Sequence, residues 1–85
     1  MPDFKNIEYL LSQLMLEAQL VFSDVEMREV QRFIAVGEYG LALETIVDIY
    51  FEEKKVASMQ AINIIESLAY AMSMDPISLL QGISK

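Results

Sequence analysis

Residues 41–54 read Leu-Ala-Leu-Glu-Thr-Ile-Val-Asp-Ile-Tyr-Phe-Glu-Glu-Lys, and this stretch decides the fold that we predict. Its apolar residues cover more than half of a helical circumference, which is more than a helix with a single buried side requires. They are Ala42, Leu43, Ile46, Val47, Ile49, Tyr50 and Phe51. We therefore predict a central helix from about Leu41 to Lys54 that packs against neighbours on several sides.

Two further helices precede this central one. The first is predicted to begin after the N-cap Asp3 and to end near Phe22, and its buried stripe is Phe4, Ile7, Leu11, Leu14 and Ala18. In the second, Ser23 and Glu26 have the spacing of a capping box, in which each side chain binds an otherwise unpaired backbone N–H. This helix is expected to bury Met27, Val30, Phe33 and Ile34, and Gly37 supplies the left-handed residue that ends it.

Two helices follow. Ser58 is the expected N-cap of a fourth helix that buries Ala61, Ile62, Ile65, Leu68, Ala69 and Met72. Asp75 and Pro76 then begin a short fifth helix, which carries Ile77 and Leu80 and ends at Gly82. The 85 residues form one domain. The predicted fold is all-α: a compact four-helix bundle with a short fifth C-terminal helix.

The composition argues against catalysis and metal binding. The chain has no cysteine and no histidine, so it lacks thiolate ligands, the commonest general base and the commonest metal ligand. An acyl carrier protein would need its phosphopantetheine serine, in an Asp-Ser-Leu motif, at the start of the second helix. The nearest match here, Glu66-Ser67-Leu68, lies midway along the fourth helix. We predict a protein that is not an enzyme, holds no cofactor or metal, and works by binding.

Charge narrows the class of partner. Thirteen Asp and Glu oppose six Lys and Arg, giving a formal net charge of −7. An acidic surface repels nucleic acid and anionic lipid, so the expected partner is a basic protein; the alternative is that acidity serves only solubility. The chain shows neither a secretion signal nor a membrane-spanning run, so a cytoplasmic location is expected.

The acids of the central helix form the principal candidate site. Glu44, Asp48 and Glu52 are four residues apart and therefore lie on one face, where like charges repel. The second helix instead spaces Asp24 to pair with Arg28 and Glu29 to pair with Arg32. The central helix has only Lys55 as a counter-charge. This pattern indicates that an external cation completes the stripe, although a solvated face screened by salt is the simpler alternative.

Other residues extend or flank this candidate site. Glu38 and Glu53 enlarge the negative zone, and Tyr39 is either a binding anchor or a filler between two helices. Tyr70, which shares the polar face of the fourth helix, is a weaker candidate. A second stripe on the first helix consists of Tyr9, Leu16 and Leu20. We interpret it as the floor beneath the fifth helix, with a dimer contact as the alternative.

Residues 33–44 also resemble a known family. The stretch Phe-Ile-Ala-Val-Gly-Glu-Tyr-Gly-Leu-Ala-Leu-Glu, followed by Asp48 and Glu52-Glu53, is similar to the signature of the MafI-type immunity proteins, which neutralise toxins of the MafB and contact-dependent growth inhibition (CdiA) systems. Residues 72–76, Met-Ser-Met-Asp-Pro, resemble the family's closing motif, although a glycine is more usual where Ser73 stands. The resemblance covers about Ser23 to Pro76.

This resemblance implies a function. A MafI- or CdiI-type immunity protein binds the C-terminal toxin domain of a delivered effector, and such domains are frequently nucleases, which are usually basic. The partner would then be a basic toxin domain, an RNase in preference to a DNase, bound 1:1 by a monomer at Glu38, Tyr39, Glu44, Asp48, Glu52 and Glu53. The alternative function is a helical adaptor or regulatory subunit that binds a basic host protein.

Overall fold

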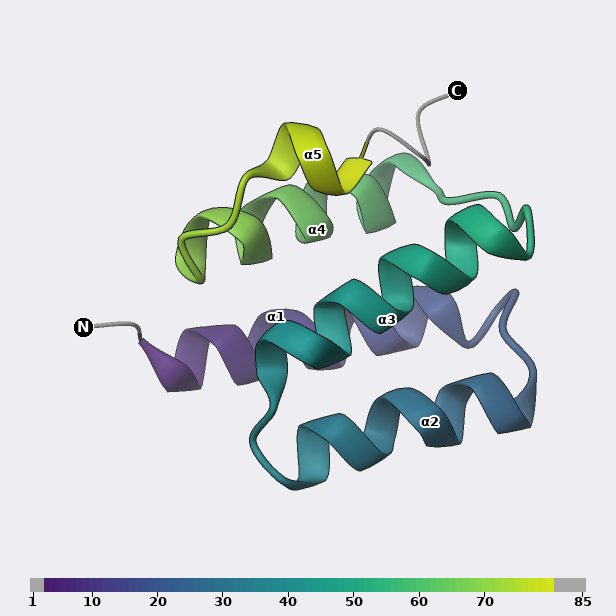
Figure 1. The fold of residues 1–85 in the computed structure, drawn as a ribbon, viewed down its shortest axis with the longest axis horizontal. Helices are drawn as coiled ribbons and strands as arrows, with labels where there is room; N and C mark the ends of the chain where they lie inside the picture. The colour runs from purple at the N-terminus through teal and green to yellow at the C-terminus, as the bar shows by residue number, and fades with distance from the viewer. Residues whose placement is uncertain (1–2, 81–85) are drawn as a thin grey trace.

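The structure is a computed structural model that describes residues 3–80. The chain folds into four main helices and a short fifth (Figure 1). The helices are α1 (Phe4–Ala18), α2 (Asp24–Ala35), α3 (Tyr39–Glu52), α4 (Met59–Ala71) and α5 (Pro76–Leu80). Successive helices run in opposite directions along the long axis of the molecule. The predicted all-α fold, a four-helix bundle with a short fifth helix, is confirmed.

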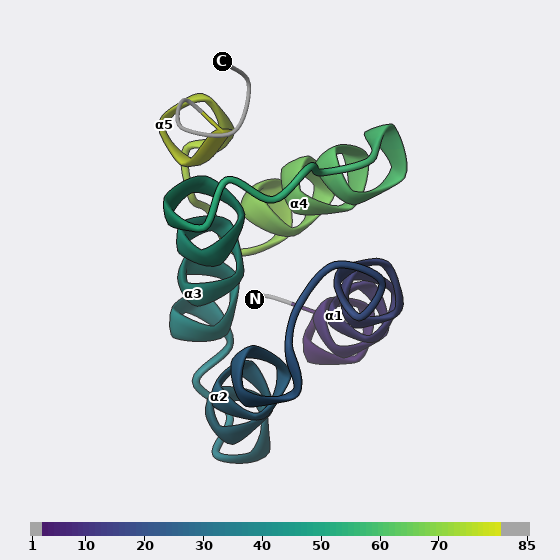
Figure 2. The same ribbon diagram turned by 90° about the vertical axis from the view of Figure 1, so that its right-hand side faces the viewer.

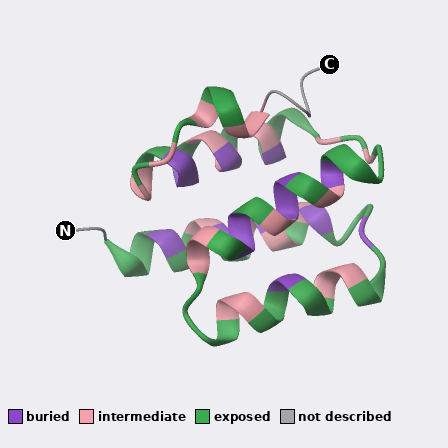
Figure 3. Ribbon diagram, in the orientation of Figure 1, coloured by how far each residue is buried: buried purple, intermediate pink, exposed green. Residues whose placement is uncertain are grey.

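The four main helices surround one apolar core. α1 packs chiefly on α4 and α2 on α3, so α1 and α3 lie diagonally across the bundle (Figure 2). The inward sides of the main helices are buried, while their outward sides are exposed (Figure 3). The core includes Ile7, Leu11, Leu14, Leu43, Ile46, Ile65 and Leu68, all at most 1% exposed. No polar residue is buried within the described part of the chain.

The predicted start signals of the helices are confirmed. The Asp3 side chain accepts a hydrogen bond from the backbone N–H of Asn6, and the Ser58 side chain accepts one from Ala61. Ser23 and Glu26 form the capping box, with a Ser23 N–H to Glu26 Oε1 distance of 2.8 Å. Because each cap satisfies a donor that the helix leaves unpaired, these side chains fix where the helices begin.

Three helices end on a left-handed residue. These residues are Gly37, Lys54 and Ser73, with φ of 77°, 53° and 58°. In each case the following N–H bonds back to a carbonyl in the last turn of the helix, for example Glu38 to Phe33 and Met74 to Ala69. The glycine is the residue that this conformation favours, whereas the lysine and the serine adopt it at a cost.

Two predicted boundaries were wrong. α1 ends at Ala18, and residues 19–22 form turns that bring Phe22 into the core. α3 spans Tyr39–Glu52, so Tyr39 and Gly40, expected in a connection, form its first turn. Glu38 precedes this helix with φ −87° and ψ 66° and makes no side-chain cap bond. Gly82, the predicted end of the fifth helix, lies outside the described residues.

Three expectations for apolar side chains were also wrong. Phe4 and Phe51, assigned to the core, are 57% and 50% exposed, because each lies at the edge of its apolar stripe. α5 lies over α3 and α4, so it does not cover the second stripe of α1. Leu16 and Leu20 of that stripe are 52% and 75% exposed.

Candidate functional site

The acids of α3 lie on its solvent side. Glu44, Asp48 and Glu52 are all exposed and, being four residues apart on a continuous helix, they follow one line along it. We call these three residues the acidic face. A rise of about 1.5 Å per residue makes it roughly 12 Å long. The predicted stripe is therefore a real feature of the surface.

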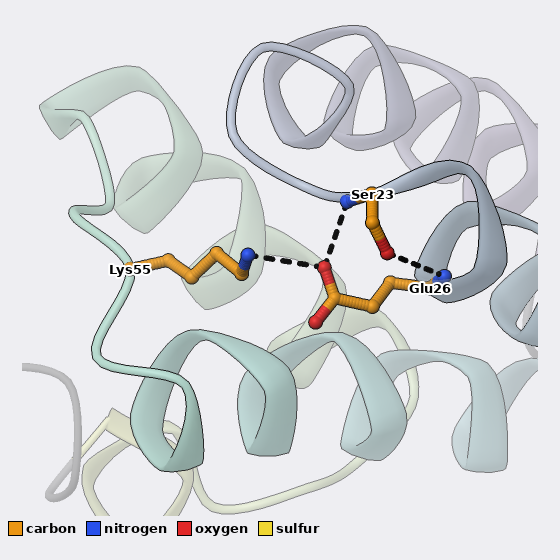
Figure 4. Close-up of polar contacts among 3 residues, drawn as sticks. All are labelled: Ser23, Glu26 and Lys55. Carbon is orange, nitrogen blue, oxygen red and sulfur yellow. Dashed lines mark hydrogen bonds and ion pairs between the residues drawn. The ribbon is translucent and has the colours of Figure 1, made fainter.

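Lys55 does not neutralise the acidic face, contrary to the prediction. Its Nζ lies 3.2 Å from Glu26 Oε1, so it joins the loop after α3 to the start of α2 (Figure 4). The same carboxylate oxygen accepts the hydrogen bond from the Ser23 N–H. This bond, together with Lys55 and against the opposing effect of partial burial, lowers the pKa of Glu26. The cation that was expected to offset the acidic face thus stabilises the fold instead.

The three acids of the acidic face make no ion pair with any residue of the described chain. Among residues 3–80 the ion pair between Lys55 and Glu26 is the only one within 4.0 Å. The pairing expected of Asp24 with Arg28 is absent: Arg28 Nε instead donates to the Asp24 carbonyl oxygen at 3.5 Å, and Arg32 makes no ion pair. The repulsion within the acidic face is therefore left to solvent or to a partner.

Two apolar side chains accompany these acids. Leu41 and Phe51 are 46% and 50% exposed, and their positions along α3 place both beside the acidic face. Sequence reasoning assigned Phe51 to the core and did not single out Leu41. Phe51 lies three residues after Asp48 and seven after Glu44, a spacing that puts it next to them.

Glu38, Tyr39 and Glu53 lie apart from the acidic face. Tyr39 is half-buried and donates its hydroxyl hydrogen to Glu8 of α1, and its ring centroid lies 6.3 Å from that of Phe4. The bond to the Glu8 carboxylate raises the pKa of Tyr39. These contacts favour the interpretation of Tyr39 as a filler between two helices. Glu38 and Glu53 are exposed at opposite ends of α3.

A cavity brings the two family-like stretches together. It has a volume of about 460 Å³ and lies where the start of α1, the α2–α3 turn and the end of α4 meet. Its lining includes Gly37–Gly40 from one stretch and Met72 and Ser73 from the other. Both stretches contain a left-handed helix end, so these residues have a structural explanation that requires no partner.

No family model, curated protein or solved structure matches this chain. The functional argument therefore depends on the residues themselves. Within the described chain, no helix is long and apolar enough to cross a membrane. Residues 3–80 also contain no group of three or more His, Cys, Asp or Glu side chains arranged to hold a metal ion.

Proposed function

We propose that this chain is a cytoplasmic immunity-type protein that binds and neutralises a basic toxin domain through α3. The observation that carries the proposal is the acidic face: three exposed carboxylates on one line, none of which forms an ion pair within the described chain. Such a line attracts a basic surface over a distance and accelerates encounter. The resemblance of residues 33–44 to the MafI-type signature supports a toxin as the owner of that surface.

Leu41 and Phe51 complete the proposed binding surface. Carboxylates at the rim of an interface mainly raise the association rate, whereas apolar and aromatic side chains at its centre hold the complex together. Both side chains are about half exposed beside the acids. We therefore assign steering to Glu44, Asp48 and Glu52, and retention to Phe51 with Leu41. The proposed toxin class is a nuclease, an RNase in preference to a DNase, because a nuclease that binds phosphates is itself basic.

The test begins with the gene neighbourhood: where a gene for a large secreted effector lies beside the gene for this chain, the effector's C-terminal domain is co-expressed with the chain and assayed for nuclease activity. We expect co-purification and loss of nuclease activity. A gene neighbourhood of metabolic enzymes, with no such effector, would instead favour the helical adaptor that binds a basic host protein.

Matched variants separate a specific site from general acidity. Glu44→Gln with Asp48→Asn and Glu29→Gln with Glu66→Gln each remove two charges, but only the first pair alters the acidic face. We expect the first pair to slow association about tenfold at low salt and the second to change it far less. Equal effects would show that net charge alone drives binding, and the assignment to α3 would then be wrong.

A further inference from the structure

The centre of the solvent side of α1 has large apolar side chains and no acid, and Glu8 and Glu17 lie to either side of it. Its three large apolar side chains, Tyr9, Leu16 and Leu20, are 60%, 52% and 75% exposed, and α5 packs elsewhere. Helical spacing places three polar residues among them. We call the whole set the α1 outer face: Lys5, Tyr9, Ser12, Gln13, Leu16 and Leu20. Large exposed apolar residues on one side of a helix are typical of an interaction surface.

We propose that a second copy of this chain docks on the α1 outer face, with the two α1 helices antiparallel. Charge selects this occupant. Two molecules of net charge −7 repel wherever their acids meet, and the six residues of the α1 outer face include no acid, with Glu8 and Glu17 at its edges. A basic partner finds no carboxylate to pair with on this face. The proposal does not depend on the function proposed for α3.

In the antiparallel register, apolar side chains of one α1 outer face lie opposite apolar side chains of the other. A two-fold axis between Ser12 and Gln13 places each Tyr9 against the partner's Leu16, because positions that sum to 25 then lie opposite each other. Ser12, at the crossing, is small and allows close approach. Its hydroxyl already donates to the Tyr9 carbonyl oxygen at 2.7 Å, so it needs no new partner when water is excluded.

Lys5 gives this register charge complementarity. It lies in the first turn of its own helix, where the helix dipole disfavours a cation, and α1 has no basic residue in its last turn. In the antiparallel pair, Lys5 lies beside the partner's Leu20, just past the C-terminal end of the partner's α1. The partial negative charge of that helix end stabilises a cation. Lys5 of each copy therefore places a cation beside the C-terminal end of the other copy's α1, which has no basic residue of its own there.

The available area sets the strength of the dimer. A stable interface removes about 800 Å² from each partner, which is more than one face of a 15-residue helix supplies. We therefore expect a weak, reversible dimer with a dissociation constant in the micromolar range or above. The acidic face is on α3, diagonally across the bundle from α1, so each copy keeps it free to bind a partner.

Sedimentation equilibrium from micromolar to millimolar protein tests the proposal. We expect the average mass to rise from monomer towards dimer, and Leu16→Gln with Leu20→Gln to raise the dissociation constant at least about tenfold. Ile77→Gln is the matched control, because Ile77 is 74% exposed on α5 and undergoes the same type of change. These substitutions are neutral, so none alters net charge. Tyr9→Gln is a second, independent variant, and circular dichroism confirms that each variant is folded.

Salt distinguishes this proposal from the one for α3. Added salt should strengthen the dimer by screening repulsion between two acidic copies, whereas it should weaken binding through the acidic face. A chain that stays monomeric at millimolar concentration overturns the proposal. A dimer that Ile77→Gln weakens as much as the α1 changes, or that the α1 changes leave intact, also overturns it.

Discussion

The solvent faces of α1 and α3 differ in chemistry although both are fully formed helical surfaces outside the core. The acidic face of α3 consists of Glu44, Asp48 and Glu52, with Leu41 and Phe51 beside it. The α1 outer face has no acid and exposes three large apolar side chains. The two faces therefore suit different partners. The first suits a basic surface, and the second suits another copy of this acidic chain.

This difference shows that net charge alone says little about where a small protein binds. The value of −7 belongs to the whole chain, but the carboxylates have different roles. Glu26 caps α2 and binds Lys55, and Glu17 binds the Ser58 hydroxyl at the start of α4 at 2.8 Å. Only acids without such contacts are free to meet a partner.

The largest expected effect contrasts the two sides of α1. Leu14 is 0% exposed and Leu16 is 52% exposed, so the same change to alanine has different consequences. We expect Leu14→Ala to lower the free energy of unfolding by about 3 kcal/mol, because it leaves a cavity in the core. Leu16→Ala should change it by less than about 0.5 kcal/mol. Urea unfolding measures both, and a large loss for Leu16→Ala would show that its face is needed by the fold.

The sequence predicts most of this fold because its helix signals are local. Three of these signals have the predicted role: the capping box of Ser23 and Glu26, the N-cap Ser58 and the left-handed Gly37. Each acts within a few residues of its own position. Phe51 could not be placed because an apolar arc wider than half of a helix does not reveal which edge stays exposed. That depends on where α5 and α2 pack, which is a long-range property.

The candidate site was predicted in part. Helical spacing is sufficient to align Glu44, Asp48 and Glu52, and all three are exposed. The partner of Lys55 was not predictable, since Glu26 is 29 positions away in the sequence and meets it only in the folded bundle. Tyr39 and its partner Glu8 are 31 positions apart. Tertiary pairing, which leaves no local pattern, decides which charged groups remain free.

The next effect concerns an acid that serves the fold. We expect Glu26→Ala to destabilise the protein by about 1 kcal/mol, because it removes both the capping-box bond and the ion pair. Glu26→Gln should cost about half as much, because the amide oxygen can still accept the bond from Ser23. Thermal unfolding in low salt measures both. Equal losses for the two variants would assign the whole effect to charge.

The pH dependence of Glu26 follows from its lowered pKa. The folded value lies below the usual 4.5, so the carboxylate stabilises the folded state fully above pH 4.5. This contribution is lost as the pH falls through the folded value. The stability difference between the natural chain and Glu26→Gln should therefore shrink between pH 7 and strong acid. A difference that persists in acid would show that the ionised carboxylate is not its source.

A smaller gain is expected at two helix ends. Lys54 and Ser73 adopt left-handed backbone conformations that glycine adopts without strain. Ser73→Gly should raise the free energy of unfolding by about 0.5–1 kcal/mol. Lys54→Gly should raise it less at low salt, because it also removes a cation two residues after Glu52. Comparing the two variants in low and high salt measures how much the Lys54 charge contributes to stability. Identical gains at every salt concentration would show that Lys54 does not offset the repulsion within the acidic face.

The smallest expected effect is on the acidic face itself. Glu44→Gln, Asp48→Asn and Glu52→Gln together remove two repulsive pairs, so the free energy of unfolding should rise by about 0.5 kcal/mol in low salt. Salt should abolish this gain, because it already screens the repulsion in the natural chain. Glu29→Gln with Glu66→Gln is the comparison variant, since these acids lie on different helices. A loss of stability in the α3 variant would mean that the acids support the fold, and the functional interpretation of the face would fail. A gain in stability together with slower binding to a basic partner is the combination expected of a surface that favours binding at the expense of folding.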